Sequence, residues 1–306
     1  MKTAWQRLIR FVATDGRTLR GEPIMPSDDF DLGTTTEATK LQARIICGDD
    51  IYDTTGATVV TDEVVTVKKL LGPLTPADVP ILRCIGLNYL EHIRETGHPV
   101  PQNPVMFIKP STSVHDHDAN VVIPKIAQDD QADYEGELCI IIGRPAKDIP
   151  PSHALDYVAA YTVGNDISAR KLQLDPSLAG PMPQADFSKG FDTFAPLDPV
   201  LVSTQIIRDP AEMGLRLRTT VDGELRQEAG VADVKFGVRE LVALLSRGTT
   251  LERGCVIMTG TPGGTGSRMN PPRWLKPGMT MEVHIDGGTC SGRSVTLLLA
   301  QCHCRF

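Results

Sequence analysis

Short apolar runs, each closed by glycine, proline or polar residues, recur along the whole chain. Runs of about four to eight such residues between turn signals are typical of β-strands. We therefore expect strands at Leu8–Ala13, Gln42–Cys47, Val64–Val67, Ile81–Gly86, Pro104–Ile108, Leu138–Ile142, Ala159–Val163, Gly214–Val221, Cys255–Thr259 and Thr280–Ile285.

Helical spacing of apolar residues is much rarer. It is clearest in Val238–Ser246, where leucines recur at intervals of three and four, as on one face of a helix. Shorter helices are expected at Tyr89–Thr96, with Asn88 as its cap, and at His153–Tyr157. Many strands with few helices predict a β-rich α+β protein.

A proline-rich connector, Leu74–Pro80, divides the chain into a small and a large part. The small part contains three expected strands and a polar segment, Ser27–Thr39, which has the composition of a loop. We predict a small β-rich N-terminal domain at 1–75 and a larger domain at 76–306.

The overall composition excludes some classes of partner. The 306 residues are 41% hydrophobic and 23% charged, with a formal net charge of −7. No basic cluster with interleaved aromatics indicates nucleic acid, and no run approaches the roughly 20 apolar residues of a membrane span. Seven scattered cysteines indicate reduced thiols and a cytoplasmic protein. A mitochondrial presequence is the alternative, since Arg7 and Arg10 could share a helical face.

Two glutamates one residue apart are the first candidate site. Glu135 and Glu137 lead into the apolar run Leu138–Ile142, and Asp166 closes another apolar run. Residues i and i+2 of a strand share a face, and carboxylates buried there require a cation. Three carboxylates with room for water suit a divalent cation such as Mg²⁺. Taken alone, the glutamate pair also fits two solvated acids at a strand mouth.

A histidine and a glutamate form the second candidate. His92 and Glu95 are three residues apart in the expected helix, so they share a face. A carboxylate beside an imidazole raises its basicity and yields a general base that can deprotonate water. The spacing alone also fits a surface histidine with an incidental acid, and Glu91 is the poorer partner because it points elsewhere.

Several polar residues could meet an acidic ligand. Arg170 and Gln173 follow Asp166 by four and seven residues, which is one helical face if a helix starts at Asp166. Lys109 and Lys189 are isolated cations beside a strand end and a glycine; such lysines are usually only solvated. The glycine-rich loop in 258–266 offers backbone N–H groups to an anion.

Together, and in this order, these motifs resemble the fumarylacetoacetate hydrolase family. The resemblance covers roughly residues 80–290. The small N-terminal part also looks like the domain appended to bacterial and fungal members. The matching runs are Cys84–Tyr89 with His92 and Glu95, Lys109–Pro110, Asp133–Leu138, Tyr161–Arg170, Lys189–Pro196 and Thr259–Gly264.

The resemblance implies a mixed β-sandwich or β-roll fold, usually in a homodimer. It also implies Mg²⁺, with Mn²⁺ or Ca²⁺ as alternatives, bound by Glu135, Glu137 and Asp166. The substrate would be a small 2-oxo or dicarbonyl acid. In this family the His–Glu pair activates water to break a C–C bond, and the metal stabilises the departing enolate. By resemblance, the catalytic residues are His92, Glu95 and Lys189, and the substrate-binding residues are Lys109, Arg170, Gln173 and Thr261.

The reaction itself stays open at this point. Hydrolysis of an acylpyruvate or similar 1,3-diketo acid is the leading hypothesis. Family members with the same metal site decarboxylate oxaloacetate-like acids or interconvert their keto and enol forms, and a repurposed biosynthetic member is a further alternative. The segment 174–185 departs from the family pattern; we expect it to form part of the pocket wall, which leaves the identity of the substrate open. The C-terminal residues 294–306 are also atypical, and no role is predicted for them.

Overall fold

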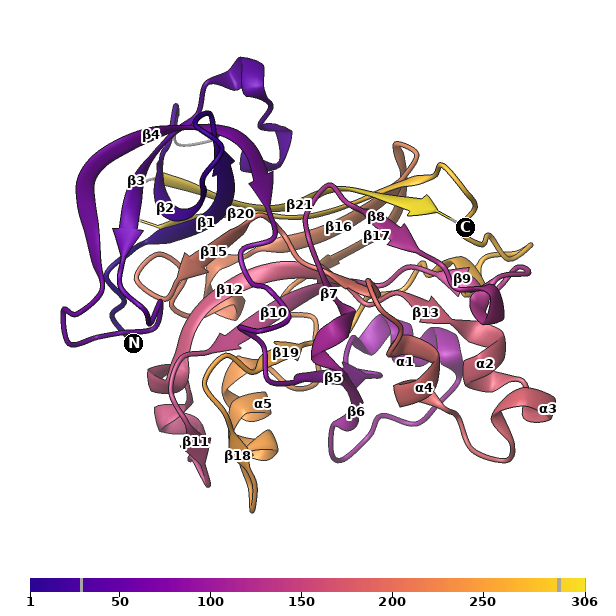
Figure 1. Cartoon of the computed structure of the whole chain (residues 1–306). Helices are drawn as coiled ribbons and strands as arrows, with labels where there is room; N and C mark the ends of the chain where they lie inside the picture. Colours follow the sequence, from indigo (N-terminus) through magenta and orange to yellow (C-terminus); the bar gives the residue numbers. More distant parts are fainter. Residues whose placement is uncertain (28–29, 291–292, 306) are drawn as a thin grey trace.

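Strands carry the fold, as the apolar runs predict, and they form two large sheets (Figure 1). The computed structural model describes residues 1–27, 30–290 and 293–305. The larger sheet has ten strands in the order β2 (Thr18–Ile24), β3 (Gln42–Cys47), β4 (Val59–Leu71), β1 (Arg7–Ala13), β15 (Val200–Ser203), β12 (Val158–Asn165), β10 (Gly136–Ile142), β19 (Val256–Met258), β5 (Leu82–Gly86) and β6 (Val105–Lys109).

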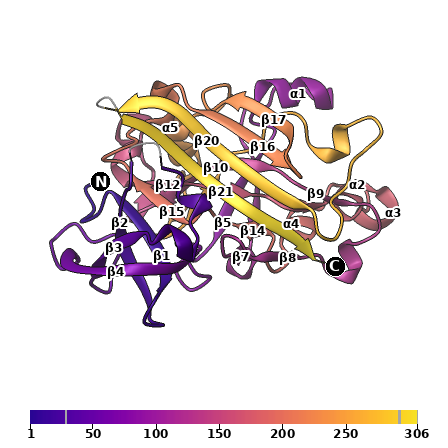
Figure 2. The ribbon, with the colours of Figure 1, turned by 90° about the horizontal axis from the view of Figure 1, so that it is seen from above.

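The second sheet lies across the first. Its order is β17 (Glu224–Gly230), β16 (Arg216–Val221), β20 (Thr280–Cys290), β21 (Arg293–Arg305) and β8 (Asn120–Val122). The long antiparallel pair β20 and β21 runs diagonally over β10 and β12 (Figure 2). Three two-stranded pairs complete the strands: β11 (Ala146–Lys147) with β18 (Thr250–Leu251), β13 (Ser168–Ala169) with β9 (Ala132–Asp133), and β14 (Ala195–Pro196) with β7 (Val114–His115).

Strand β10 is buried on both faces. Leu138 and Ile140 join a core with Val283 of the second sheet, whereas Cys139 and Ile141 pack into a separate core on the other side. A strand covered on both sides has no polar face, so its apolar run is unbroken. The double burial of β10 also places the residues at its start deep inside the molecule.

Four short helices gather at one side of the sheets (Figure 1). They are α1 (Leu90–Thr96), α2 (Arg170–Leu174), α3 (Pro176–Ala179) and α4 (Ala185–Lys189), while α5 (Val238–Leu245) lies elsewhere. The helix expected at His153–Tyr157 is a 3₁₀ helix instead, spanning Pro151–Tyr157. Other 3₁₀ turns are Leu32–Thr34, Glu37–Thr39, Ser111–Ser113, Lys125–Ala127, Pro210–Met213 and Gly266–Arg268.

The segment Ser27–Thr39, expected to be a plain loop, contains two of these 3₁₀ turns, and Asp28 and Asp29 lie outside the described residues. The strands β1 to β4 continue the large sheet, because β1 pairs with β15. The domain boundary at residue 75 therefore stays a prediction.

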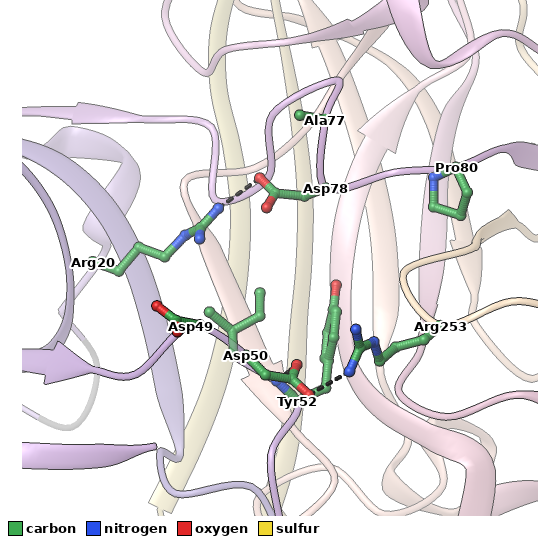
Figure 3. A pocket seen from close by; sticks show the side chains of 9 residues that line it. Arg20, Asp49, Asp50, Tyr52, Ala77, Asp78, Pro80 and Arg253 are labelled. Atoms are coloured by element: carbon green, nitrogen blue, oxygen red, sulfur yellow. Dashed lines mark hydrogen bonds and ion pairs between the residues drawn. The ribbon is translucent and has the colours of Figure 1, made fainter. Parts of the chain in front are cut away.

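Ion pairs also link the first 75 residues to the rest of the chain. Arg20 pairs with Asp78 at 2.6 Å, and Arg253 pairs with Asp50. The two pairs border a polar cavity of about 280 Å³, into which the Tyr52 ring projects (Figure 3). No helix within the described part of the chain is long and apolar enough to cross a membrane.

Candidate active site

Three buried carboxylates meet where β10 and β12 lie side by side. The pairing of Gly136 with Asn165 brings the start of β10 next to the end of β12. The Asp166 N–H donates to the Glu135 carbonyl at 2.8 Å, which fixes the two backbones together. As a result Glu135, Glu137 and Asp166 each offer a carboxylate oxygen within 4.8 Å of the other two.

Three cationic side chains surround this group. Lys189 Nζ lies 2.7 Å from Glu135 Oε2 and 2.6 Å from Asp166 Oδ2. Arg170 donates to Glu135 Oε1 and, at 2.8 Å, to Asp133 Oδ2. Lys109 Nζ lies 2.5 Å from Asp166 Oδ1. These contacts join three carboxylates, Glu135, Asp166 and Asp133, to three cations.

The remaining carboxylate, Glu137, has no such partner. It is 1% exposed, and among the described residues it makes no ion pair with a side chain; its Oε2 accepts a hydrogen bond from the Gly260 N–H at 2.7 Å. A buried carboxylate without a cation is costly. Among the described residues no side-chain cation balances this carboxylate, so its charge requires either a proton or a bound cation.

The ionisation of the two glutamates reflects this difference. Burial alone would raise the pKa of Glu135, but Lys189 and Arg170 outweigh burial and hold it at about 2. Burial raises the pKa of Glu137 well above its ordinary value, and the charges of Asp166 and Glu135 raise it further. For Lys189, burial would lower the pKa, yet Asp166 and Glu135 raise it above its usual value.

The carboxylate group suits a divalent cation. Ligand oxygens lie about 2.0–2.1 Å from Mg²⁺ and about 2.3–2.6 Å from Ca²⁺, so oxygens on opposite sides of either ion are within about 5 Å of each other. The three carboxylate oxygens, which lie within 4.8 Å of one another, could therefore contact the same ion. Each carboxylate oxygen also has two lone pairs, so it can accept an N–H and contact a metal together. Glu135, Glu137 and Asp166 could thus hold a metal ion.

The histidine and glutamate of α1 lie beside this site. His92 Nδ1 and Glu95 Oε2 are 3.2 Å apart, which leaves Nε2 of the ring free for another partner. His92 lines the same cavity as Glu135 and Lys189. An ideal Cβ on Gly263 would lie 2.7 Å from Glu95 Cδ. A side chain at position 263 would therefore displace the Glu95 carboxylate, which is the flexible end of a partly exposed side chain.

Two local expectations about helix starts are wrong. Asn88 does not cap α1, whose N-cap is Tyr89. Instead its buried amide donates to the carbonyls of Thr259 and Phe236, which ties the start of α1 to the loop after β19. The helix carrying Arg170 does not start at Asp166; the short strand β13 intervenes and α2 begins at Arg170.

The residues expected to bind substrate separate into two groups. Arg170, Gln173 and Thr261 line the cavity, as does Lys189, which was expected to be catalytic. Lys109 does not: its side chain is 0% exposed, and its ammonium also donates to the carbonyls of Phe194 at 2.6 Å and Ile167 at 3.4 Å. With Asp166 these acceptors use all three N–H donors of the ammonium, which lies against Asp166 rather than the cavity.

Two of the cavity residues are already held by protein partners. Gln173 Oε1 accepts from Arg170 at 2.9 Å, which leaves its NH₂ group for a ligand. The Thr261 hydroxyl donates to the Gly136 carbonyl at 3.0 Å, so its proton is not available to a substrate while this bond holds.

Sequence reasoning missed Gln227, a buried residue of β17. Its Nε2 donates to Thr261 Oγ1 at 2.8 Å and to the Pro262 carbonyl at 2.9 Å, and its Oε1 accepts from the Gly136 N–H at 3.0 Å. Gln227 therefore fastens the glycine-rich loop to the strand that carries the two glutamates. Nothing in the alternating pattern of β17 distinguishes this glutamine, because its role depends on strands distant in sequence.

Asp133 is the second residue that was not singled out. Besides Arg170, it accepts from the Gly266 N–H at 2.8 Å and the Ser267 N–H at 3.2 Å. Its place in the run Asp133–Glu137, directly before the two glutamates, was the available signal.

The model of the fumarylacetoacetate (FAA) hydrolase C-terminal family matches residues 82–296, more than half of the chain. The chain belongs to this family. It is 37% identical over 292 residues to a caffeoylpyruvate hydrolase from Neonothopanus nambi, covering 94% of this chain and 92% of that one.

Other family members carry different names. An oxaloacetate tautomerase from Bacillus subtilis is 38% identical over 228 residues, covering 74% of this chain and 72% of the relative. Among solved structures, a fumarylacetoacetate hydrolase from Exiguobacterium antarcticum superposes with a TM-score of 0.70 at 30% identity, covering 98% and 99% of the two chains. These likenesses confirm the predicted family and its β-rich fold.

Proposed function

We propose that this family member is a Mg²⁺-dependent hydrolase that cleaves a C–C bond in an acylpyruvate or a similar 1,3-diketo acid. The observation that carries the proposal is Glu137, a buried carboxylate without an ion-pair partner among the described residues, beside Glu135 and Asp166. The relative named caffeoylpyruvate hydrolase, which matches along 94% of the chain, supports the choice of substrate class.

Glu135, Glu137 and Asp166 would hold the metal. A divalent cation there would polarise the neighbouring oxygens of an oxo acid and offset the negative charge that develops on its pyruvate part. Mn²⁺ and Ca²⁺ also accept carboxylate oxygens, so the metal ion in the cell is to be measured.

His92 would act as the general base. Its Nδ1 faces Glu95, so its Nε2 would take a proton from a water molecule in the cavity. The resulting hydroxide would attack the distal carbonyl carbon, and the C–C bond to the pyruvate part would then break. The electron pair of that bond passes to the pyruvate part as an enolate, which takes up a proton to give pyruvate.

Lys189 and Gln173 would hold the oxygens of the substrate. An ammonium has three N–H donors, and the two ion pairs of Lys189 leave one for a substrate oxygen. The free NH₂ of Gln173 would bind the carboxylate of the oxo acid, and Arg170 would keep Gln173 and Glu135 in position. We propose that Lys109 positions Asp166 rather than binding substrate directly.

A cleavage assay tests this proposal. Protein stripped with a chelator should not cleave acetylpyruvate, and adding Mg²⁺ should restore the formation of pyruvate. His92→Ala should abolish cleavage while the Mg²⁺-dependent rise in melting temperature is kept. If no acylpyruvate of a varied panel is cleaved with any divalent metal, the hydrolase proposal is wrong.

An oxaloacetate tautomerase is the second candidate, supported by the Bacillus subtilis relative. The same His92 could move a proton between carbon and oxygen without a water attack. Faster interconversion of the keto and enol forms of oxaloacetate, with no acylpyruvate cleavage, would favour this alternative.

We also propose a homodimer, because an apolar strip is exposed along the edge of the large sheet. Met106 and Ile108 of β6 are 44% and 39% exposed, and Phe187 of the adjoining α4 is 52% exposed. Exposed apolar patches of this kind often mark interfaces. Analytical ultracentrifugation should show a dimer that Phe187→Glu weakens; a monomer at all concentrations would contradict the proposal.

A further inference from the structure

The cavity above the carboxylates is deeper than the reacting groups require. It has a volume of about 420 Å³, within the range of about 300–1,000 Å³ that suits drug-sized ligands. The burial of the lining residues distinguishes the floor of the cavity from its mouth. Glu135 and Lys189 are buried and form the floor, whereas Leu174 and Arg268 are exposed and lie at the mouth. A short acyl group placed on the floor would leave the outer half of the cavity to solvent.

Apolar side chains from three segments contribute to the cavity lining. Leu87 lies before α1, Leu174 and Pro183 belong to the segment 174–185, and Trp274 comes from the loop after β19. Phe107 lies closer to the floor, where its ring centroid is 4.9 Å from Lys189 Nζ. Flat aromatic rings such as indole bind planar apolar groups through their faces.

One cation at the mouth, Arg268, has no partner among the residues that the structure describes. Arg170 and Lys189 are paired with carboxylates, but in the described ranges the Arg268 guanidinium makes no ion pair or hydrogen bond. A guanidinium presents several N–H donors in one plane and binds oxygen acceptors well. Arg268 is therefore free to meet the far end of a ligand.

The loop that carries Arg268 and Trp274 is fixed in place. The Arg273 N–H donates to the Gly266 carbonyl at 2.9 Å, and the Leu275 N–H donates to the Ala132 carbonyl at 2.9 Å. Gly266 itself is held by Asp133, the partner of Arg170. The outer wall is thus anchored to the same residues that order the floor.

We infer that the outer half of the cavity is a subsite for a flat, unsaturated acyl group whose far end carries an oxygen acceptor. Trp274 contacts the face of that group, and Arg268 donates to its terminal oxygen. The inference rests on the proposed cleavage of acylpyruvates and adds the class of acyl group. The terminal oxygen could belong to a phenol or to a carboxylate, and the two sources are separated by the choice of substrates.

Four substrates form the test: acetylpyruvate, cinnamoylpyruvate, 4-hydroxycinnamoylpyruvate and fumarylpyruvate. With Mg²⁺, kcat/KM should be lowest for acetylpyruvate. Trp274→Ala should lower kcat/KM about tenfold or more for the three unsaturated substrates and leave acetylpyruvate within about twofold. Arg268→Gln should lower it about tenfold only for substrates with a far oxygen. A larger loss of kcat/KM with 4-hydroxycinnamoylpyruvate identifies a phenol as the preferred acceptor, and a larger loss with fumarylpyruvate identifies a carboxylate.

Matched variants and a binding readout accompany the assay. Arg273→Gln is the control, because Arg273 lies on the same loop but pairs with Glu224 and does not line this cavity. Trp274→Phe should restore most of the activity lost in Trp274→Ala. The dissociation constants of the same compounds for the Mg²⁺-loaded protein, measured by thermal shift, should follow the same order.

The outcomes separate this inference from the proposed function. If all four acylpyruvates are cleaved alike and neither Trp274→Ala nor Arg268→Gln discriminates among them, the subsite is refuted and the hydrolase stands. If none is cleaved but the order of binding and its dependence on Trp274 and Arg268 hold, the hydrolase is refuted and the subsite stands.

Discussion

The Lys109 ammonium lies 2.5 Å from Asp166 Oδ1, and both side chains are fully buried. Removing one partner of a buried pair leaves an uncompensated charge, which costs roughly 3–5 kcal/mol. The pair therefore holds one of the proposed metal ligands in a fixed position from behind the site.

We predict that Lys109→Met lowers the free energy of unfolding by about 3 kcal/mol, because Asp166 keeps only its bond to Lys189. The double variant Lys109→Met/Asp166→Asn should lose less free energy of unfolding than the sum of the losses in the two single variants. Chemical denaturation of the four proteins measures this coupling. A Lys109→Met protein of normal stability with a raised KM would instead show that Lys109 binds substrate.

Gln227→Leu should disturb the metal site although Gln227 is neither a proposed metal ligand nor part of the cavity lining. The change removes the bonds to Thr261 and Pro262 and leaves the buried Gly136 N–H without its acceptor, at a cost of about 1–3 kcal/mol. We expect weaker Mg²⁺ binding and a lower kcat.

Gln205→Leu is the matched control for that variant. Gln205 also donates two side-chain hydrogen bonds, to the carbonyls of Thr3 and Trp5, away from the site. Because Gln205 is exposed, this variant should lose less stability than Gln227→Leu, and it should retain its Mg²⁺ affinity. Equal loss of Mg²⁺ affinity in both variants would refute a positioning role for Gln227.

Gly263→Ala should impair the His92–Glu95 pair while leaving Mg²⁺ binding intact. The added methyl group would overlap the Glu95 carboxylate, and Glu95 must move away from His92 to relieve the contact. We expect kcat to fall about tenfold or more, since an oriented base contributes about 10²–10⁴-fold. Melting temperature and its response to Mg²⁺ should change little, and unchanged kcat would contradict the role given to Glu95.

The junction between the N-terminal strands and the rest should depend on pH. Burial alone would raise the pKa of Asp78, but hydrogen bonds from Thr75 and the charge of Arg20 outweigh burial and lower it. A carboxyl with a lowered folded pKa stabilises the fold above its ordinary pKa of about 3.9, and this contribution is lost as pH falls through the folded value.

Asp78→Asn should therefore reduce stability by about 1 kcal/mol at pH 7 and by progressively less below pH about 4. Melting temperatures of both proteins across this range provide the measurement. A difference that does not vary with pH would show that the charge of Asp78 contributes nothing.

Local patterns predicted most of the strands, because strands such as β10 are buried on both faces and read as unbroken apolar runs. They also predicted the nearness of Glu135 to Glu137 and of His92 to Glu95, which depends only on spacing within one element. They could not show that Lys109 turns away from the cavity, since that depends on the packing of β6 against Asp166 and Phe194. The bridging by Gln227 and the interior bonds of Asn88 were hidden for the same reason.

Hydrolysis in ¹⁸O-labelled water shows whether water enters the product of the proposed reaction. With acetylpyruvate and Mg²⁺, we expect one labelled oxygen in the released acetate. The label should be absent when the metal is chelated, and it should not appear with His92→Ala or Glu137→Gln. Unlabelled acetate, or keto–enol interconversion with no acetate formed, would contradict a hydrolase that uses His92 to activate water beside the three carboxylates.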